Sequence, residues 1–277
     1  MEKSFRPRKS LGQNFLIDDN IARKIVRAAA VDSNDVLLEI GPGRGALTKY
    51  LIQQAKTVIA VEIDKRAIEI LEEKFEKELE AHKLRIERED FLTIDLFGIS
   101  KKFTRPLRVI GNIPYYITSP ILFKVIEGRQ VVHDLTMLVQ LEVGRRIVAK
   151  PRTKDYGILS VFCQFYGMPE LLFKVPATAF FPKPKVVSAL LRLDFSRQSV
   201  YHVRDEKLFV AIVRATFGKR RKTLRNGLKY LSIEGLDTST LDFDLNLRPE
   251  QLSVWDFVEL SNKISQQLEP MSMVKIE

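Results

Sequence analysis

The sequence predicts an α/β fold in which a doubly wound sheet is followed by a small all-helical domain. First, short apolar runs alternate with helical patterns along most of the 277 residues, as in repeated strand–helix–strand units. Second, a glycine-rich turn joins the first apolar run to a helical pattern. Third, strand patterns stop near residue 196, so we expect one domain at 1–195 and a helical domain at 196–277.

The elements of the first domain follow from hydrophobic periodicity. Residues 18–30 place apolar side chains at helical spacing behind Asp18 and Asp19, either of which can cap a helix. Short apolar runs predict strands at 36–40, 57–61, 84–89, 107–111 and 135–141. Helical patterns between these runs predict helices that begin near residue 46 and at 67–81, 119–127 and 144–150.

The end of the first domain lacks a convincing helix, and the second domain lacks strands. Apolar runs predict strands at 159–166 and 171–175, and an alternating pattern predicts a last strand at 187–195. Because no helix separates them, we expect an antiparallel edge of the sheet. The second domain shows helical segments at 207–216, 222–230, 249–251 and 254–267.

A glycine turn and a following carboxylate predict a nucleoside-binding site. The run 41–45, Gly-Pro-Gly-Arg-Gly, follows the first strand, where missing side chains let backbone approach a ligand. Its spacing differs from the dinucleotide G-x-G-x-x-G, and no Gly-Lys-Ser/Thr of a phosphate-binding loop follows. The next strand ends in Glu62, which is placed to accept hydrogen bonds from two ribose hydroxyls. A cofactor with ribose but no phosphate, such as S-adenosylmethionine, fits this pattern.

A second signal follows the strand at 107–111. Asn112-Ile113-Pro114-Tyr115 combines an amide acceptor, a proline that restrains the backbone, and an aromatic ring. Such a segment can hold a flat base by its exocyclic amine, which points to chemistry on adenine or cytosine. A plain turn is the alternative interpretation.

Charge and composition favour a polyanionic partner. The chain has 45 basic and 35 acidic residues, a formal net charge of +10. Basic residues gather without acids at 143–154 and 207–229, and the N-terminus adds Lys3, Arg6, Arg8 and Lys9. Three basic clusters favour nucleic acid over solvated surface. An anionic membrane is the competing partner, but no amphipathic terminal helix or lipidation motif supports it.

Other classes of protein are disfavoured. No apolar run reaches the roughly 20 residues of a membrane span, and residues 1–10 lack a secretory signal. The single cysteine, Cys163, excludes an intramolecular disulfide and is expected to be a buried thiol. Three scattered histidines predict no catalytic metal. We expect a cytoplasmic location.

Six short segments, in order along nearly the whole chain, carry a resemblance to a known family. They are Gly12-Gln13-Asn14-Phe15-Leu16, Glu39-Ile40-Gly41-Pro42-Gly43-Arg44-Gly45, Glu62-Ile63-Asp64, Asp90-Phe91, Asn112-Ile113-Pro114-Tyr115 and Phe180-Phe181-Pro182-Lys183-Pro184-Lys185-Val186. The sequence resembles the KsgA-type ribosomal RNA adenine dimethyltransferases, and more loosely the Erm resistance methylases and related mitochondrial transcription factors. The resemblance implies a Rossmann-like S-adenosylmethionine-dependent methyltransferase sheet and a helical RNA-binding domain.

The resemblance also implies a set of cofactor-binding residues. Asn14 and Leu16 would close over the methionine end of the cofactor, and Gly41 would let it approach the backbone. Glu62 would bind the ribose. The remaining cofactor contacts would come from Ile63 and Asp90 at the adenine and from Asn112.

For catalysis, the resemblance and the chemistry of an adenine amine agree. The amine is a poor nucleophile because its lone pair is delocalised into the ring. If the Asn112 side chain and the Ile113 carbonyl accept its hydrogens, the lone pair can point at the methyl donor. Tyr115 and Phe180 are expected to stack on an extruded target base from opposite sides. No Cys, Asp or His base is needed.

The resemblance predicts dimethylation of two adjacent adenosines near the 3′ end of small-subunit (16S) ribosomal RNA, within the subunit or its precursor, by a monomer. The run Lys219-Arg220-Arg221-Lys222 is expected to bind that RNA. Three alternatives stay open: an Erm-type enzyme of large-subunit RNA, a non-catalytic assembly or transcription factor, and, more remotely, a DNA amine methylase. Ile113, where the KsgA type more often has leucine, weakens the separation from the Erm type.

Overall fold

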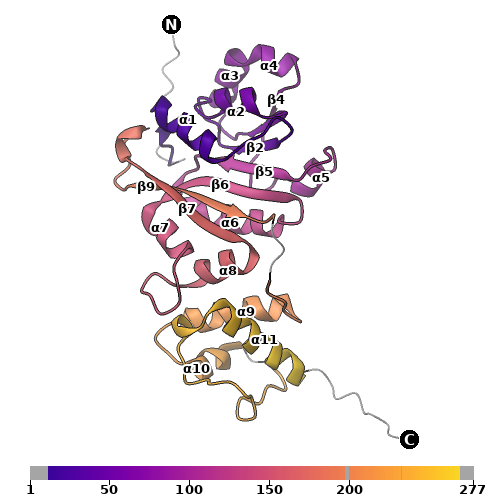
Figure 1. The fold of residues 1–277 in the computed structure, drawn as a ribbon, viewed down its shortest axis with the longest axis vertical. Helices are drawn as coiled ribbons and strands as arrows, with labels where there is room; N and C mark the ends of the chain where they lie inside the picture. Colours follow the sequence, from indigo (N-terminus) through magenta and orange to yellow (C-terminus); the bar gives the residue numbers. More distant parts are fainter. Residues whose placement is uncertain (1–11, 197–199, 232, 269–277) are drawn as a thin grey trace, which may run out of the picture. The chain divides into compact units, whose positions relative to one another are not determined.

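The computed structural model describes residues 12–196, 200–231 and 233–268 (Figure 1). Contacts divide the chain into unit 1, Met1–Gly144 and Tyr166–Arg197, and unit 2, Arg145–Phe165 and Gln198–Glu277. The expected division after residue 195 assigned 145–165 to the first domain, whereas these residues group with the helical unit. Aromatic packing within unit 2 explains the difference, because the Phe165 ring stacks on Phe209 with centroids 4.2 Å apart.

A seven-stranded sheet forms the centre of unit 1, in the order β4-β3-β2-β5-β6-β9-β7. The strands are β2 (Val36–Ile40), β3 (Thr57–Val61), β4 (Leu84–Glu87), β5 (Leu107–Gly111), β6 (Val132–Gln140), β7 (Met168–Val175) and β9 (Ser188–Asp194). Strands β2 to β6 pair in parallel, while β9 pairs antiparallel with both β6 and β7. The predicted sheet and its antiparallel edge are therefore confirmed.

The strand order creates a switch point beside β2. From β2 the chain runs outward to β3 and β4, then returns to the other side of β2 as β5. In open α/β sheets, ligands bind at the carboxyl ends of the strands where the order reverses. This topology brings the ends of β2, β3 and β5 together, and the glycine turn, Glu62 and Asn112 follow those three ends.

The helices of unit 1 begin where capping chemistry allows. They are α1 (Asp19–Ala28), α2 (Thr48–Gln54), α3 (Lys65–Lys74), α4 (Glu76–Glu80), α5 (Leu96–Ser100) and α6 (Thr118–Glu127), and α7 (Leu141–Ile147) follows β6 directly. Asp18 caps α1 by accepting from the backbone amides of Asn20 and Ile21. The single helix expected at 67–81 is instead two helices, which meet at the buried Phe75.

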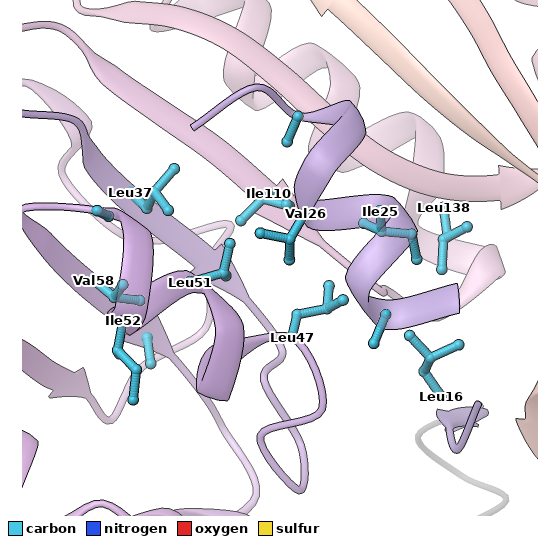
Figure 2. Close-up of a cluster of buried hydrophobic side chains, with 14 of the residues drawn as sticks. Leu16, Ile25, Val26, Leu37, Leu47, Leu51, Ile52, Val58, Ile110 and Leu138 are labelled. Carbon is cyan, nitrogen blue, oxygen red and sulfur yellow. The ribbon is translucent and has the colours of Figure 1, made fainter. Parts of the chain in front are cut away.

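The core of unit 1 lies between the sheet and the helices. Figure 2 shows Ile25 and Val26 of α1 beside Leu138 of β6 and Ile110 of β5, with Leu51 near Val58 of β3 and Leu47 between Leu51 and α1. The alternate strand residues Leu38, Ile59 and Val109 are also buried. Both faces of the parallel strands are therefore covered, which explains why the strands read as continuous apolar runs.

A two-stranded antiparallel sheet joins distant parts of unit 1. Its strands are β1 (Phe15–Leu16) and β8 (Phe180–Phe181), and β8 follows the 3-10 turn η3 (Ala177–Ala179). Phe15 pairs with Phe181, and Leu16 pairs with Phe180. The pairing brings the segment before α1 against the segment before β9.

Unit 2 is helical. It holds most of α8 (Ile158–Tyr166), then α9 (Glu206–Gly218), α10 (Leu224–Leu228) and α11 (Val254–Leu268), with 3-10 turns η4 (Lys229–Leu231) and η5 (Pro249–Gln251). The strand predicted at 159–166 is wrong, because this apolar run is α8 and buries Val161, Phe162 and Phe165. Cys163 lies in the same helix, and burial raises the pKa of its thiol to about 12. Within the described ranges, no helix is long and apolar enough to cross a membrane.

Candidate active site at the carboxyl ends of the strands

The glycine turn after β2 opens toward a pocket in unit 1. Gly41 has φ +60°, and a Cβ added there would meet no other part of the molecule within 4 Å. Gly43 has φ +55°, and a Cβ there would lie 3.0 Å from the Phe15 ring. The positive φ angles favour glycine at both positions. Gly41 therefore leaves backbone open to a ligand, and Gly43 lets Phe15 of β1 pack on the turn.

Glu62 links the glycine turn to the end of β3. One carboxyl oxygen accepts from the Gly43 amide at 3.1 Å, and the other accepts from the Ile63 and Asp64 amides at 2.9 Å each. Burial raises the pKa of Glu62, while these backbone hydrogen bonds oppose the rise. The carboxyl group keeps capacity to accept from a ligand, since two oxygens offer about four acceptor positions.

Asp64 continues this hydrogen-bonded edge. It caps α3 and accepts from Gln13 Nε2 at 3.3 Å. Hydrogen bonding from the Arg66 guanidinium holds the pKa of Asp64 below its ordinary value. The Gln13 contact links the segment before α1 to Asp64 at the start of α3, and Gln13 itself lines the pocket.

Glu39 is an acidic residue inside the otherwise apolar β2. Its side chain is buried and accepts from Thr48 Oγ1 at 2.7 Å. Burial raises the pKa of Glu39 to about 8, and the nearby Glu62 adds to the rise. Our sequence reasoning gave Glu39 no role, although a charge within a buried strand was a signal that could have drawn attention to it.

The side chain of Asn112 is held by the N-terminal segment. Its Nδ2 donates to the backbone carbonyl of Asn14 at 3.0 Å, and Asn14 Nδ2 donates to the Gly12 carbonyl at 3.3 Å. This contact restrains the side-chain amide of Asn112, whose oxygen is its only acceptor atom. Asn112 therefore presents an oriented acceptor at the pocket.

Most of the predicted site residues line this one pocket. The predicted residues that line it are Asn14, Leu16, Gly41, Glu62, Ile63, Asp90, Asn112 and Ile113. Further lining residues that the sequence reasoning did not assign are Phe15, Glu39 and Tyr116. Asp90 also accepts from the Leu92 amide at 2.9 Å, so the same residue shapes its own turn.

Tyr115 and Phe180, the predicted stacking pair, lie outside the lining of this pocket. The Tyr115 hydroxyl is hydrogen-bonded to the Ser188 hydroxyl of β9, which fixes its half-buried ring. Phe180 is only 2% exposed, because its partner across the short sheet is the buried Leu16. The expected stacking of Phe180 on the target base, opposite Tyr115, stays a prediction. Phe181, one residue on, is 59% exposed.

The basic run after α9, Lys219–Lys222, contains residues that differ in their contacts and exposure. Arg220 Nε donates to Glu250 at 2.8 Å, and its Nη2 donates to the Thr153 carbonyl at 3.2 Å. The Lys219 ammonium lies 4.9 Å from the centre of the Tyr230 ring. Arg221 and Lys222 are exposed. The basic cluster predicted at the N-terminus, from Lys3 to Lys9, lies outside the described residues.

A second hollow, contained in unit 2, surrounds Arg220. Its lining is strongly basic and consists of Arg152, Thr153, Lys154, Arg220, Arg248, Glu250 and Gln251. Among the residues that the structure describes, no group of three or more His, Cys, Asp and Glu side chains could hold a metal ion.

Comparison with known proteins agrees with this geometry. The sequence profile of the family described as "Ribosomal RNA adenine dimethylase" matches residues 4–266. A protein called "Ribosomal RNA small subunit methyltransferase A" from Francisella tularensis subsp. novicida is 43% identical over 266 residues, which cover 96% of this chain and 100% of that protein. Its counterpart from Francisella tularensis subsp. holarctica gives the same values.

Solved structures share the fold. The crystal structure of a dimethyladenosine transferase from Plasmodium falciparum matches with a TM-score of 0.74 and 24% identity, covering 91% of this chain and 98% of that one. The crystal structure of the 23S rRNA methyltransferase ErmE matches with a TM-score of 0.67 and 27% identity, covering 91% and 100%.

The sheet order, the glycine turn and the acidic end of β3 define a Rossmann-like methyltransferase fold. The chain belongs to the ribosomal RNA adenine dimethylase family.

Proposed function

We propose that this enzyme dimethylates the N6 amines of two adjacent adenosines near the 3′ end of small-subunit ribosomal RNA, with S-adenosylmethionine as methyl donor. The observation that carries the proposal is the Asn112 side chain, which lines the pocket and whose amide is held by the backbone carbonyl of Asn14. The 43% identity to proteins named as small-subunit methyltransferases supports the choice of RNA.

The pocket fits a nucleoside cofactor. Gly41 leaves space where a side chain would project, as close approach of a ligand to backbone requires. Glu62 has acceptor capacity for ribose hydroxyls at the end of β3, and Asp90 lines the same pocket as an acceptor for an adenine amine. The exposed side chain of Ile63 supplies an apolar surface for the adenine ring. When bound, S-adenosylmethionine supplies an electrophilic methyl group on a sulfonium.

The chain's own groups prepare the target amine. The Asn112 oxygen and the Ile113 carbonyl accept its hydrogens, which favours a pyramidal nitrogen with an available lone pair. The Asn14 contact keeps the Asn112 amide from rotating during the reaction, so catalysis rests on positioning and electrostatics. The first transfer forms an N–CH3 bond in place of one N–H bond, and the displaced proton leaves to solvent. One hydrogen remains on the nitrogen, and a site with two acceptors can still orient it.

The Tyr115 ring is the stacking surface for the target base. Its ring is held by the hydrogen bond to Ser188, and burial raises the pKa of the phenol, so the hydroxyl stays protonated. A base paired within a helix could not enter such a site, so the target adenosine must be unpaired or extruded.

The helical unit supplies RNA affinity through its basic side chains. Arg221 and Lys222 are exposed at the end of α9 and can neutralise phosphates. Arg220 is engaged with Glu250 and Thr153, so its role is to hold the basic hollow together. Because ribosomal subunits are the substrate, we place the enzyme in the cytoplasm. We further propose that it acts as a monomer.

A specific experiment separates this proposal from an Erm-type activity on large-subunit RNA, which the 27% identity to ErmE brings into consideration. The enzyme is offered immature small subunits and naked large-subunit RNA in parallel, and methylated positions are mapped by mass spectrometry. Dimethyladenosine confined to the small-subunit RNA is expected. Methylation of the large-subunit RNA alone would refute the assignment, and no methylation of either RNA would favour a non-catalytic assembly factor.

A further inference from the structure

The short β1–β8 sheet has one face in the core and one face toward solvent. Leu16 and Phe180 pair with each other and are 6% and 2% exposed. Because neighbouring residues of a strand point to opposite faces, Phe15 and Phe181 share the other face. Phe181 is 59% exposed there.

This second face is continuous with the active-site pocket. Phe15 lines the pocket, and its ring packs on Gly43 of the glycine turn. Directly paired residues of antiparallel strands hold their Cβ atoms about 5 Å apart. Phe181 therefore lies next to Phe15 at the edge of the pocket. Tyr116, 64% exposed, is a second aromatic side chain on the pocket lining.

The residues after Phe181 are cationic and apolar. Lys183 and Lys185 are both exposed, and Val186 and Val187 are 40% and 43% exposed. No acidic residue occurs between 177 and 187. An exposed aromatic ring with flanking lysines is the combination that proteins use on single-stranded nucleic acid, where rings stack on bases and cations follow the phosphates.

We propose that Phe181 stacks on an unpaired base adjacent to the target adenosine, while Lys183 and Lys185 contact the neighbouring phosphates. The inference rests on the proposed function, since it names how that site grips its RNA. It assigns Phe181 a contact with a base beside the target and leaves the predicted role of Phe180 at the target base itself unchanged. The Phe181 ring would hold the RNA strand beside the target adenosine, so its main effect would be on RNA affinity.

The test uses Phe181→Ala, Phe181→Leu and Phe181→Trp in the full-length enzyme with immature small subunits. Phe181→Ala and Phe181→Leu are expected to raise the KM for RNA about 10- to 100-fold, the cost of one lost base stack. Leucine keeps an apolar side chain but has no aromatic face, so it separates stacking from apolar contact. Phe181→Trp should restore the KM. Cofactor affinity by calorimetry and the Tm should stay at wild-type values in all three.

A spectroscopic signal provides the second arm. With Trp255→Phe as background, Phe181→Trp gives a single tryptophan, and stacking should quench its fluorescence when RNA is added. Unchanged KM in Phe181→Ala together with unquenched fluorescence would overturn the inference. Failure of the wild-type enzyme to methylate small-subunit RNA would instead overturn the proposed function, so the two failures are distinct.

Discussion

The side-chain amide of Asn112 donates a hydrogen bond to the backbone carbonyl of Asn14 at 3.0 Å, across 98 positions of the sequence. The contact joins the end of β5 to the segment that precedes α1. It restrains the rotation of the Asn112 amide. The residue that the sequence marked as catalytic is thus oriented by the backbone of a distant segment that lines the same pocket.

Replacing Asn112 by alanine should remove the acceptor that orients the target amine. We expect kcat to fall by about 100-fold or more, the typical cost of losing one preorganised polar group. RNA affinity should stay nearly intact, because the phosphate contacts lie elsewhere. Single-turnover methylation and filter binding measure the two quantities. Equal loss of turnover and RNA affinity would contradict the role given to Asn112.

Glu62 is predicted to control cofactor affinity. In Glu62→Gln the amide nitrogen can face the Gly43 amide, so at least one of three backbone contacts is lost. Glu62→Ala loses all three. We expect the Kd for S-adenosylhomocysteine to rise about 10-fold in the first variant and about 100-fold in the second. Calorimetry gives the Kd, and a uniform value across the three proteins would refute ribose binding by Glu62.

Glu39 should make stability depend on pH. Its pKa is raised from 4.5 to about 8, so the folded protein keeps a proton that the unfolded chain releases above pH 4.5. The contribution of Glu39 to the free energy of unfolding is therefore largest below pH 4.5. It declines as the pH rises toward 8, by up to about 1.4 kcal/mol per pH unit.

Glu39→Gln should flatten that decline, since the amide stays neutral and its oxygen can still accept from Thr48. A residual slope of the same sign is expected from Glu62, whose pKa is also raised. Denaturant unfolding at pH 5, 6, 7 and 8 measures the slope. A variant that tracks the wild-type curve throughout would show that Glu39 ionises normally.

The residues of the basic run Lys219–Lys222, which follows α9, should differ in function: some bind RNA, and Arg220 stabilises unit 2. Arg221→Glu and Lys222→Glu should each weaken RNA binding and reduce the slope of log affinity against log salt by about one. Arg220→Ala should act mainly on unit 2, with a loss of stability of about 1 kcal/mol or less, because its ion pair with Glu250 is partly exposed. Salt titrations of RNA binding, with unfolding curves of the same variants, distinguish the two effects.

Most of the strands and most of the residues that line the pocket were predictable, because local sequence patterns indicate them. Continuous apolar runs identified β2, β3 and β5, and polar residues at their ends identified Glu62 and Asn112. Parallel strands place such ends at one edge of the sheet, so the site could be inferred before any contact was known.

The failures have physical causes that lie outside local pattern. The run 159–166 is mostly apolar, and a short buried helix then has nearly the same signature as a buried strand. The burial of Phe180 and the exposure of Phe181, which the sequence did not distinguish, depend on register with β1, about 165 positions upstream. A shift of one residue would reverse the two faces, and no local pattern specifies it.

The pairing of β1 with β8 has a consequence for the order of events during two successive methylations. Phe15 and Leu16 of β1 line the candidate pocket, β8 carries Phe181, and the two strands pair with each other. Whatever steadies one strand lowers the entropic cost of steadying the other. If donor binding orders β1 and RNA binding orders β8, each ligand would strengthen the binding of the other by the same factor.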